Sequence, residues 1–459
     1  MISNDLRCPR RFFLMTAAFA AVLTFGPGGA QAATWTVDPS MGRQAIQAVI
    51  DGASNGDTVL FLAGTYNWSD TPLSYKWENT GAIVIQDKTL TIKGAPGAVL
   101  VGRPSIDGTT GLAQGINAFV VIDQDLNNDV TFDGLLFQTF LRGVRCGWLS
   151  SRDPANGDEV FEPNLRNLTV VNCIFRDMHR ESVSVSNLGG NALVRNNDMT
   201  GPYIALFVDW YWSPGRDWQW QPEGTIIQCL GNRVYSPGLG FYFCQTRNVA
   251  VSDNTVAEAG VWAIEMNRTY LGAVMSGNVL SRCWGGILLV GPAIGATVER
   301  NELTDILDRG ISLRTDDAAG NVISRNRIAM AAGSRWAVLS NAKNNFYGQN
   351  KIRGAGELAF CLYGEETEEG RHEVAHHEIM QGNSVDGFTP VYCYFYFDPT
   401  THDNLVVGSG MDTNTFYDEG VNNRITGGTS VAGGIGQDLR KAILLRNDTL
   451  KEAREILRH

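Results

Sequence analysis

Hydrophobic and polar positions follow a repeating pattern through the middle of the chain. Segments of the form apolar-x-x-Asn-x-apolar recur, among them VRNNDM, VSDNTV, MSGNVL, VERNEL, ISRNRI and MQGNSV. Their asparagines lie at positions 197, 232, 254, 278, 301, 326, 350 and 383. Most intervals are 22 to 25 residues, and Cys173 and Leu135 occupy the same column in two degenerate upstream copies. The chain is therefore predicted to consist of short repeats, interrupted by three longer gaps.

Each repeat carries a second alternating segment at a fixed distance after its asparagine, as a half-buried strand requires. These segments are SVSV near 182, ALFV near 205, AIEM near 263, ILLV near 287, GISL near 310, LAFC near 358 and YCYF near 392. Offsets of 10 and 12 residues are predicted to point inward, at Ile264 and Met266, Leu288 and Val290, Ile311 and Leu313, Phe360 and Leu362. Offsets of 11 and 13 are predicted to face water, at Glu265 and Asn267, Ser312 and Arg314.

Repeats of this length bury an apolar face only by stacking, each coil about 4.8 Å above the last. Asparagine fits a tight corner because it tolerates the left-handed backbone region and its side chain can bond to its neighbours in adjacent coils. The leucine pattern of leucine-rich repeats and the 3.6-residue periodicity of helical repeats are both missing. The sequence therefore predicts an all-β solenoid.

The stacked segments, together with the opening AIQAVIDGASNGDTVLFLAGTY at 45–66, resemble the pectin-lyase-like superfamily of right-handed parallel β-helices. The resemblance covers residues 40 to 430 and implies a fold shared by pectate lyases and polygalacturonases, not one activity. In such folds a helix often covers the first coil, and here Ser40 is expected to cap a helix that buries Ile46, Val49 and Ile50. The expected organisation is a signal peptide at 1–32, a β-helix domain at 33–436 and a C-terminal capping helix at 437–459.

The N-terminus predicts export. Arg10 and Arg11 precede an apolar run from Phe12 to Phe25, and Ala30-Gln31-Ala32 follows as a cleavage site. The arginine pair resembles a twin-arginine signal, with general secretion as the alternative. The mature protein is expected in the periplasm or outside the cell, with no membrane span after removal of the signal.

The net charge limits the binding partners to be expected, and the cysteine count bears on the interior. The net charge of −11 argues against nucleic acid, and it repels an acidic polysaccharide unless a basic patch or bound Ca²⁺ reverses the local field. Of eight cysteines, Cys8 lies in the signal segment, and the other seven are predicted to be mainly small buried hydrophobes.

The three long gaps predict one binding edge, because each insertion enters just after offset 13. They run from Trp148 to Glu162, Asp209 to Gly224 and Tyr363 to Arg371. The middle insertion holds four tryptophans that are predicted to contact sugar rings, or else to pack the loop onto the coils: Trp210, Trp212, Trp218 and Trp220.

Charged and polar residues follow the same edge between the second and third insertions: Arg247, Glu265, Asn267, Arg268, Arg314, Asp316 and Asp317. Abstraction of the proton next to a uronate carboxylate needs a base and a cation, which Arg268 or Arg314 with Ca²⁺ would supply. Glycoside hydrolysis needs two carboxyl groups, Glu265 with Asp316 or Asp317. Arg247 and Asn267 are expected to bind substrate, and a solvated edge with salt bridges is the alternative.

Polygalacturonase-like members of the superfamily carry an adjacent Asp pair with Gly-His-Gly and Arg-Ile-Lys segments, and Asp316-Asp317 matches only the first. The expected function is that of an exported polysaccharide-active enzyme, a lyase on a uronate-containing glycan ahead of a hydrolase or epimerase. The rival is a non-catalytic β-helix that binds a glycan, a metal or a protein.

Two motifs suggest metal. Asp123, Asp125, Asn127 and Asp129 alternate as in a Ca²⁺ loop, although the Gly and Glu of an EF-hand are missing and a polar turn explains the pattern equally well. The segment from His372 to His376 matches His-Glu-x-x-His, which needs a helix where a strand is expected. His179, at the start of a strand, is a minor acid–base candidate.

Overall fold

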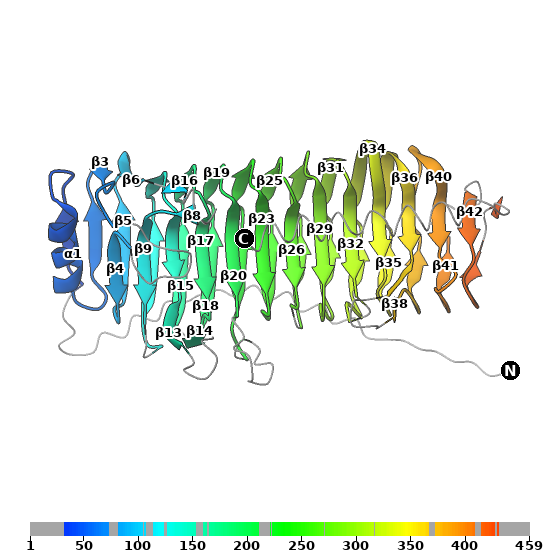
Figure 1. Ribbon diagram of the computed structural model, residues 1–459, viewed down its shortest axis with the longest axis horizontal. Coiled ribbons are helices and arrows are strands. Elements are labelled where there is room, and N and C mark those ends of the chain that lie inside the picture. The colour runs from blue at the N-terminus through cyan, green and yellow to red at the C-terminus, as the bar shows by residue number, and fades with distance from the viewer. Residues whose placement is uncertain are drawn as a thin grey trace.

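The computed structural model describes residues 32–72, 81–103, 105–106, 113–123, 126–152, 159–162, 165–210, 221, 223–269, 271–315, 317–366, 372–408, 415–426 and 429–430. Their regular structure is almost entirely β-strand, wound into a long row of stacked coils (Figure 1). The predicted signal peptide and the predicted C-terminal helix at 437–459 lie outside these residues, apart from position 32. No helix within these ranges has both the length and the apolar character needed to cross a membrane.

The strands form three parallel ladders, and each coil in the middle of the solenoid contributes one strand to each ladder in turn. Ladder 1 is a 15-stranded sheet: β1 (Thr34–Val37), β2 (Thr58–Phe61), β5 (Leu90–Gly94), β10 (Asp129–Asp133), β15 (Asn167–Val171), β18 (Asn191–Arg195), β21 (Ile227–Leu230), β24 (Val249–Ser252), β27 (Val274–Ser276), β30 (Thr297–Glu299), β33 (Val322–Ser324), β35 (Phe346–Gly348), β39 (Ile379–Gln381), β41 (Leu405–Val407) and β43 (Arg424–Ile425).

Ladders 2 and 3 join into one sheet because two strands, β34 (Arg327–Ser340) and β36 (Lys351–Leu362), run through both. Ladder 2 also contains β3 (Gly64–Asn67), β6 (Ala98–Val101), β11 (Leu136–Gln138), β16 (Ile174–Arg176), β19 (Asp198–Thr200), β22 (Arg233–Tyr235), β25 (Thr255–Ala257), β28 (Val279–Ser281) and β31 (Glu302–Ile306). Ladder 3 contains β4 (Ile83–Gln86), β9 (Asn117–Ile122), β12 (Arg142–Cys146), β17 (Glu181–Ser186), β20 (Ile204–Asp209), β23 (Leu239–Cys244), β26 (Trp262–Asn267), β29 (Gly285–Val290), β32 (Arg309–Arg314), β40 (Phe388–Phe397), β42 (Thr415–Asp418) and β44 (Thr429–Ser430).

Three short antiparallel pairs stand outside the ladders. They are β7 (Ser105–Ile106) with β8 (Ala113–Gln114), β13 (Trp148–Arg152) with β14 (Glu159–Glu162), and β37 (Gly364–Glu366) with β38 (His372–Val374). The last two belong to the first and third predicted insertions.

The interior is filled by aligned rows of apolar side chains, since parallel pairing in register places equivalent residues over one another. One row of ladder 3 runs through Ile264, Ile287 and Ile311, and the next through Met266, Leu289 and Leu313. The prediction for Leu288 and Val290 was wrong. They pair with Glu265 and Asn267 on the outward face, because this coil reaches its strand one residue sooner after the asparagine.

Side chains on the outward face of ladder 3 are not always exposed to solvent. Glu265 and Ser312 do point away from the interior, yet both are buried, at 5% and 0% exposure. The expectation that they face water is therefore wrong. All seven cysteines in the described ranges are free thiols, and all but Cys244 are buried, which confirms their role as small hydrophobes.

The asparagine column is confirmed as a continuous hydrogen-bonded row. From Asn197 to Asn350, each side-chain Nδ2 and backbone N–H donates to Oδ1 of the next asparagine, at 2.9 to 3.1 Å. Cys173 N–H joins the row at Asn197. The left-handed residue, however, is the one before each asparagine, as at Asn196 (φ 56°) and Asp253 (φ 58°).

One helix, α1 (Arg43–Gly52), covers the first coil at the left end of Figure 1. It buries Ile46 and Ile50, whereas Val49 stays half-buried. Ser40 does not cap it, because the N-cap position is Gly42 and no side chain bonds there. Instead, the Gln47 amide bonds to both the N–H (2.9 Å) and the carbonyl (2.8 Å) of Val84 and so satisfies the edge strand β4.

Candidate functional site

The described parts of the insertions leave the coils at one edge, the carboxyl end of ladder 3. The hairpin β13–β14 follows β12, the second insertion begins at Asp209 at the end of β20, and the hairpin β37–β38 follows β36. In Figure 1, β13, β14 and β38 all lie along the lower side of the solenoid. The edge predicted from the gap positions is therefore present, and we call it the insertion edge.

Beside the root of the second insertion, the outward face of ladder 3 opens into a half-exposed patch. Phe207 on β20 and Tyr242 on β23 stack face to face, with ring centroids 5.3 Å apart and 7° between the planes. Asp209, Cys244 and Asn267 continue the next outward row across three coils and are also half-buried. With Glu265 and Arg268, these residues form what we call the Asp209 site.

The Asp209 carboxyl group is held in a protonatable state. Its Oδ1 is shut off from solvent and has no hydrogen-bond partner among the described residues. Burial therefore raises the pKa of Asp209 to about 6, against the opposing effects of a hydrogen bond from Ser186 and the positive charge of Arg145. A carboxyl group with this pKa can accept or release a proton near neutral pH.

The neighbouring groups of the Asp209 site remain protonated. Burial, reinforced by the nearby Cys244 and Glu265 groups, raises the pKa of Tyr242 well above its ordinary value. Burial and then the charge of Asp209 raise the pKa of Cys244 to about 12. Arg268, an exposed cation in the left-handed turn after β26 (φ 53°), acts electrostatically on the Cys244 thiol and so lies within range of the same groups.

A buried arginine–carboxylate cluster borders the site on its N-terminal side. Arg142 Nε lies 2.5 Å and Arg180 Nε 3.2 Å from the carboxylate of Glu181, and Arg145 donates to Ser184 (2.9 Å) and Ser186 (3.1 Å). Burial alone would raise the pKa of Glu181, but the three guanidinium groups together lower it below its ordinary value. Glu181 is therefore a fixed anion, in contrast to Asp209.

The predicted edge residues divide between two places. Glu265, Asn267 and Arg268 belong to the Asp209 site, and Asn267 Nδ2 lies 3.4 Å from the Tyr242 hydroxyl. Arg314 and Asp317 lie about two coils further along, roughly 10 Å at ordinary strand spacing. Asp316 lies outside the described residues.

The described residues of the second insertion pack against the coils of the solenoid. Arg247 pairs with Glu223 at 3.6 Å, and its backbone N–H donates to Gln221 at 3.2 Å. Trp210 is only 6% exposed, which corresponds to the packing alternative for this ring. Trp212, Trp218 and Trp220 lie outside the described residues.

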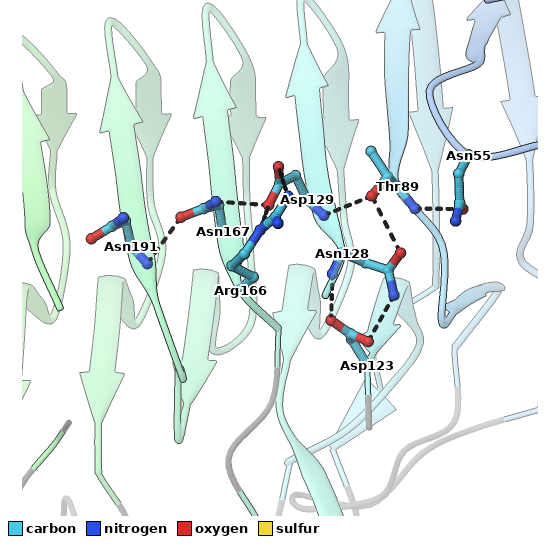
Figure 2. Close-up of polar contacts among 8 residues, drawn as sticks. All are labelled: Asn55, Thr89, Asp123, Asn128, Asp129, Arg166, Asn167 and Asn191. Atoms are coloured by element: carbon cyan, nitrogen blue, oxygen red, sulfur yellow. Dashed lines mark hydrogen bonds and ion pairs between the residues drawn. The ribbon is translucent and has the colours of Figure 1, made fainter. Parts of the chain in front are cut away.

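The acidic segment from Asp123 to Asp129 holds a corner together (Figure 2). The buried Asp123 carboxylate accepts from the backbone N–H (3.0 Å) and the side chain (2.8 Å) of Asn128. Asp129 instead accepts from Arg166 at 2.6 and 2.8 Å and from Asn167 at 2.7 Å. The two carboxylates thus serve different partners, Asn127 is exposed and Asp125 lies outside the described residues, which favours the polar turn over a Ca²⁺ loop.

The His-Glu-x-x-His segment does not form the zinc centre considered for it. Residues His372–Val374 are strand β38, so the His-Glu-x-x-His segment lacks the helix that would bring its histidines to one face. His179 lines a shallow depression with Asp177, Tyr203 and Ser236, and burial lowers its pKa.

Nothing in the local pattern singled out Phe207 and Tyr242 as a pair, because 35 residues separate them and the second insertion lies between them. The one available signal was positional. Both rings lie 10 residues after an asparagine, Asn197 or Asn232, which places them in one column, although the pattern assigned that offset to the interior.

Comparisons with known proteins agree on the fold. A family model described as the right-handed β-helix region matches residues 222–370, which is less than half of the chain. No curated protein matches the chain by sequence. With its three parallel ladders, the chain has the right-handed parallel β-helix fold.

Solved structures similar to this chain include a family 28 exopolygalacturonase from Yersinia enterocolitica (13% identity, 87% of this chain and 79% of that chain, TM-score 0.39). Others are the periplasmic alginate epimerase AlgG (10% identity, 82% and 85%, TM-score 0.41) and the A-module of a mannuronan C-5 epimerase from Azotobacter vinelandii (16% identity, 86% and 97%, TM-score 0.37). At such low identities and TM-scores, nothing about the activity of this chain follows from these neighbours.

Proposed function

We propose that this chain is an exported enzyme that acts on a uronate-containing polysaccharide along the insertion edge, by β-elimination at the Asp209 site. The observation that carries the proposal is a carboxyl group with a pKa near 6, placed beside a half-exposed aromatic stack and an exposed cation. Perturbed carboxyl groups of this kind concentrate at reaction centres.

The aromatic pair supplies the binding surface. Phe207 and Tyr242 are parallel rings that stack on each other across adjacent coils, and their outer ring surface is apolar and can pack against the C–H groups of a sugar. Arg268 would neutralise the uronate carboxylate, and Arg314 and Asn267 would hold neighbouring sugar units along the axis of the solenoid. The local cations thus offset the net negative charge of the chain.

Proton transfer would depend on the different pKa values of Asp209, which acts as the base, and Tyr242, which acts as the acid. Ionised Asp209 removes the proton next to the uronate carboxylate, whose developing charge Arg268 stabilises. The bond to the leaving oxygen then breaks as a carbon–carbon double bond forms. The Tyr242 hydroxyl, which its raised pKa keeps protonated, gives its proton to that oxygen.

Elimination can be tested by incubating the purified chain with alginate, pectate, a glycosaminoglycan and a neutral glycan while following the ultraviolet absorbance of unsaturated products. Because the base must be ionised, kcat should rise with pH through about 6 and then level off. Asp209→Asn should lower kcat by about 100-fold or more. Phe207→Ala should mainly raise KM.

The matched control is Asp198→Asn, which removes an exposed carboxyl group on ladder 2. It should leave turnover unchanged. Turnover that survives Asp209→Asn, or no turnover on any of the four glycans, would contradict the proposal.

Hydrolysis is the second candidate, because Asp209 and Glu265 are two carboxyl groups about two coils apart. That is roughly 10 Å, close to the wider of the two separations found in glycosidases, in which a water molecule attacks directly and the configuration inverts. Reducing ends released without ultraviolet absorbance would identify it. Solvent deuterium entering the polymer without chain shortening would identify an epimerase instead, and binding without any of these changes a non-catalytic protein.

A further inference from the structure

Three of the six histidines of the chain meet at one corner, where ladder 3 turns into ladder 1 near the C-terminal end of the solenoid. His376 and His377 precede β39 in one coil, and His402 precedes β41 in the next. An isolated bridge pairs His376 with His402 in register. The third insertion enters just before this corner, so the histidines lie on the insertion edge.

The three imidazole rings are close enough to share one ligand. One ring nitrogen from each histidine lies within 4.8 Å of the others. The His376 and His402 rings stack at 4.7 Å with 7° between their planes, and the His377 ring stands edge-on to both. Nδ1 of His376 lies 2.7 Å from Nδ1 of His377. All three side chains are at least partly accessible to solvent.

The corner itself does not require histidine. The same pair of positions is filled by Lys343 and Asn344 in the preceding coil, and by Val421 and Asn422 two coils on. His377 occupies the left-handed backbone region (φ 55°), which Asn344 and Asn422 occupy in the other coils and which suits Asn better than His. The backbone of this corner therefore does not account for three histidines at adjacent positions.

One ring is already oriented by a carboxylate. Nδ1 of His402 lies 2.9 Å from Oδ2 of Asp403, and this hydrogen bond lowers the pKa of Asp403. A carboxylate that accepts from one nitrogen of an imidazole fixes the tautomer and leaves the other nitrogen with a free lone pair. This arrangement typically stands behind metal-bound histidines.

We propose that His376, His377 and His402 bind a divalent transition-metal ion of the Zn²⁺ type. Bonds of 2.0 to 2.1 Å in a tetrahedral site place ligand nitrogens roughly 3.3 Å apart, a spacing that lies within the 4.8 Å over which the three ring nitrogens gather. Three imidazoles and no thiolate or coordinating carboxylate suit Zn²⁺, Ni²⁺ or Cu²⁺ and not Ca²⁺ or Mg²⁺, which prefer oxygen. The fourth position would be left to water.

This site is independent of the proposed elimination at the Asp209 site. It joins two successive coils through their corners, so the bound ion would act as a cross-link next to the third insertion. If the ion binds only the folded chain, it raises the unfolding temperature, and the rise grows with the logarithm of the metal concentration above Kd.

The untagged full chain, stripped with a chelator and dialysed, should be titrated with Zn²⁺ by calorimetry and with Co²⁺ by visible absorption. We expect one equivalent of Zn²⁺, a rise in Tm, and the intense visible bands of four-coordinate Co²⁺. Each ligand can be replaced by the residue that fills its column in another coil: His376→Lys, His377→Asn and His402→Val. Each variant should bind Zn²⁺ at least tenfold more weakly.

Asp403→Asn should weaken Zn²⁺ binding about tenfold while keeping the one-to-one ratio, because the Asp403 carboxylate orients His402 and does not bind the ion itself. His179→Asn, which alters a histidine elsewhere, should bind as the parent does. Unchanged affinity in His377→Asn and His402→Val, with the fold intact by circular dichroism, would overturn the proposal. So would the lack of any saturable binding by the parent chain.

Discussion

At the scale of single residues, the surroundings of a carboxyl group decide what it can do. Glu181 and Asp209 lie on neighbouring strands of the same outward face, yet three guanidinium groups surround Glu181, whereas Asp209 has one oxygen without a donor in the described structure. The pKa of Glu181 is lowered and that of Asp209 is raised to about 6. Two like groups whose pKa values diverge in this way are suited to different roles.

The raised pKa of Asp209 also has a stability consequence. Because the folded chain holds the proton more tightly than the unfolded chain, this group stabilises the fold fully below about pH 4 and loses that contribution as the pH rises to about 6. Asp209→Asn should therefore match the parent in urea unfolding at pH 4 and exceed its stability at pH 7. Equal midpoints for the two proteins at both pH values would contradict the burial argument.

At the scale of elements, the sequence predicted the coils because the asparagine column is set by local bonding. Asn197 and its equivalents must satisfy buried backbone groups at every turn, so the residue type recurs visibly. The pattern did not predict which way some strand residues face or how deeply they are buried. A fixed offset misplaced Leu288 by one position, and the burial of Glu265 depends on neighbours that the period of the repeat does not encode.

A ladder asparagine should be costly to remove. Asn278 accepts from the backbone N–H and Nδ2 of Asn254 and donates to the carbonyl of Val251 and to Asn301. Asn278→Ala would leave buried groups unpaired on both sides, and we expect a loss of about 2–5 kcal/mol in unfolding free energy. Thr255→Ala, at an exposed position of β25, should change it by less than about 0.5 kcal/mol. Similar losses for the two variants would show that the column is not what holds the corner.

At the scale of the whole molecule, the solenoid has two ends, and the N-terminal one is closed by a helix. Helix α1 and the Asp209 site differ in how far the sequence predicted them. The helix was visible from its apolar spacing, whereas the Asp209 site depends on Phe207 and Tyr242, which only the stacking of coils brings together. Sites made between coils are therefore harder to predict than the coils.

Opening the capped end should cause association, because an uncovered parallel edge pairs with other chains. Ile50→Asp places a charge among the buried side chains of α1 and should shift the protein to larger species in size-exclusion chromatography with light scattering. Ala48→Asp, on the exposed face of the same helix, should elute as the parent does. Identical elution of both variants would mean that α1 does not protect the end.

The asparagines of the column all point the same way, and each donates from its backbone N–H and from Nδ2 to the asparagine of the following coil. A newly finished turn thus offers two unpaired donors that only the next turn to leave the ribosome can accept. Growth of the solenoid is polar, like that of a filament with unlike ends, and translation runs in the direction in which each addition completes the one before it.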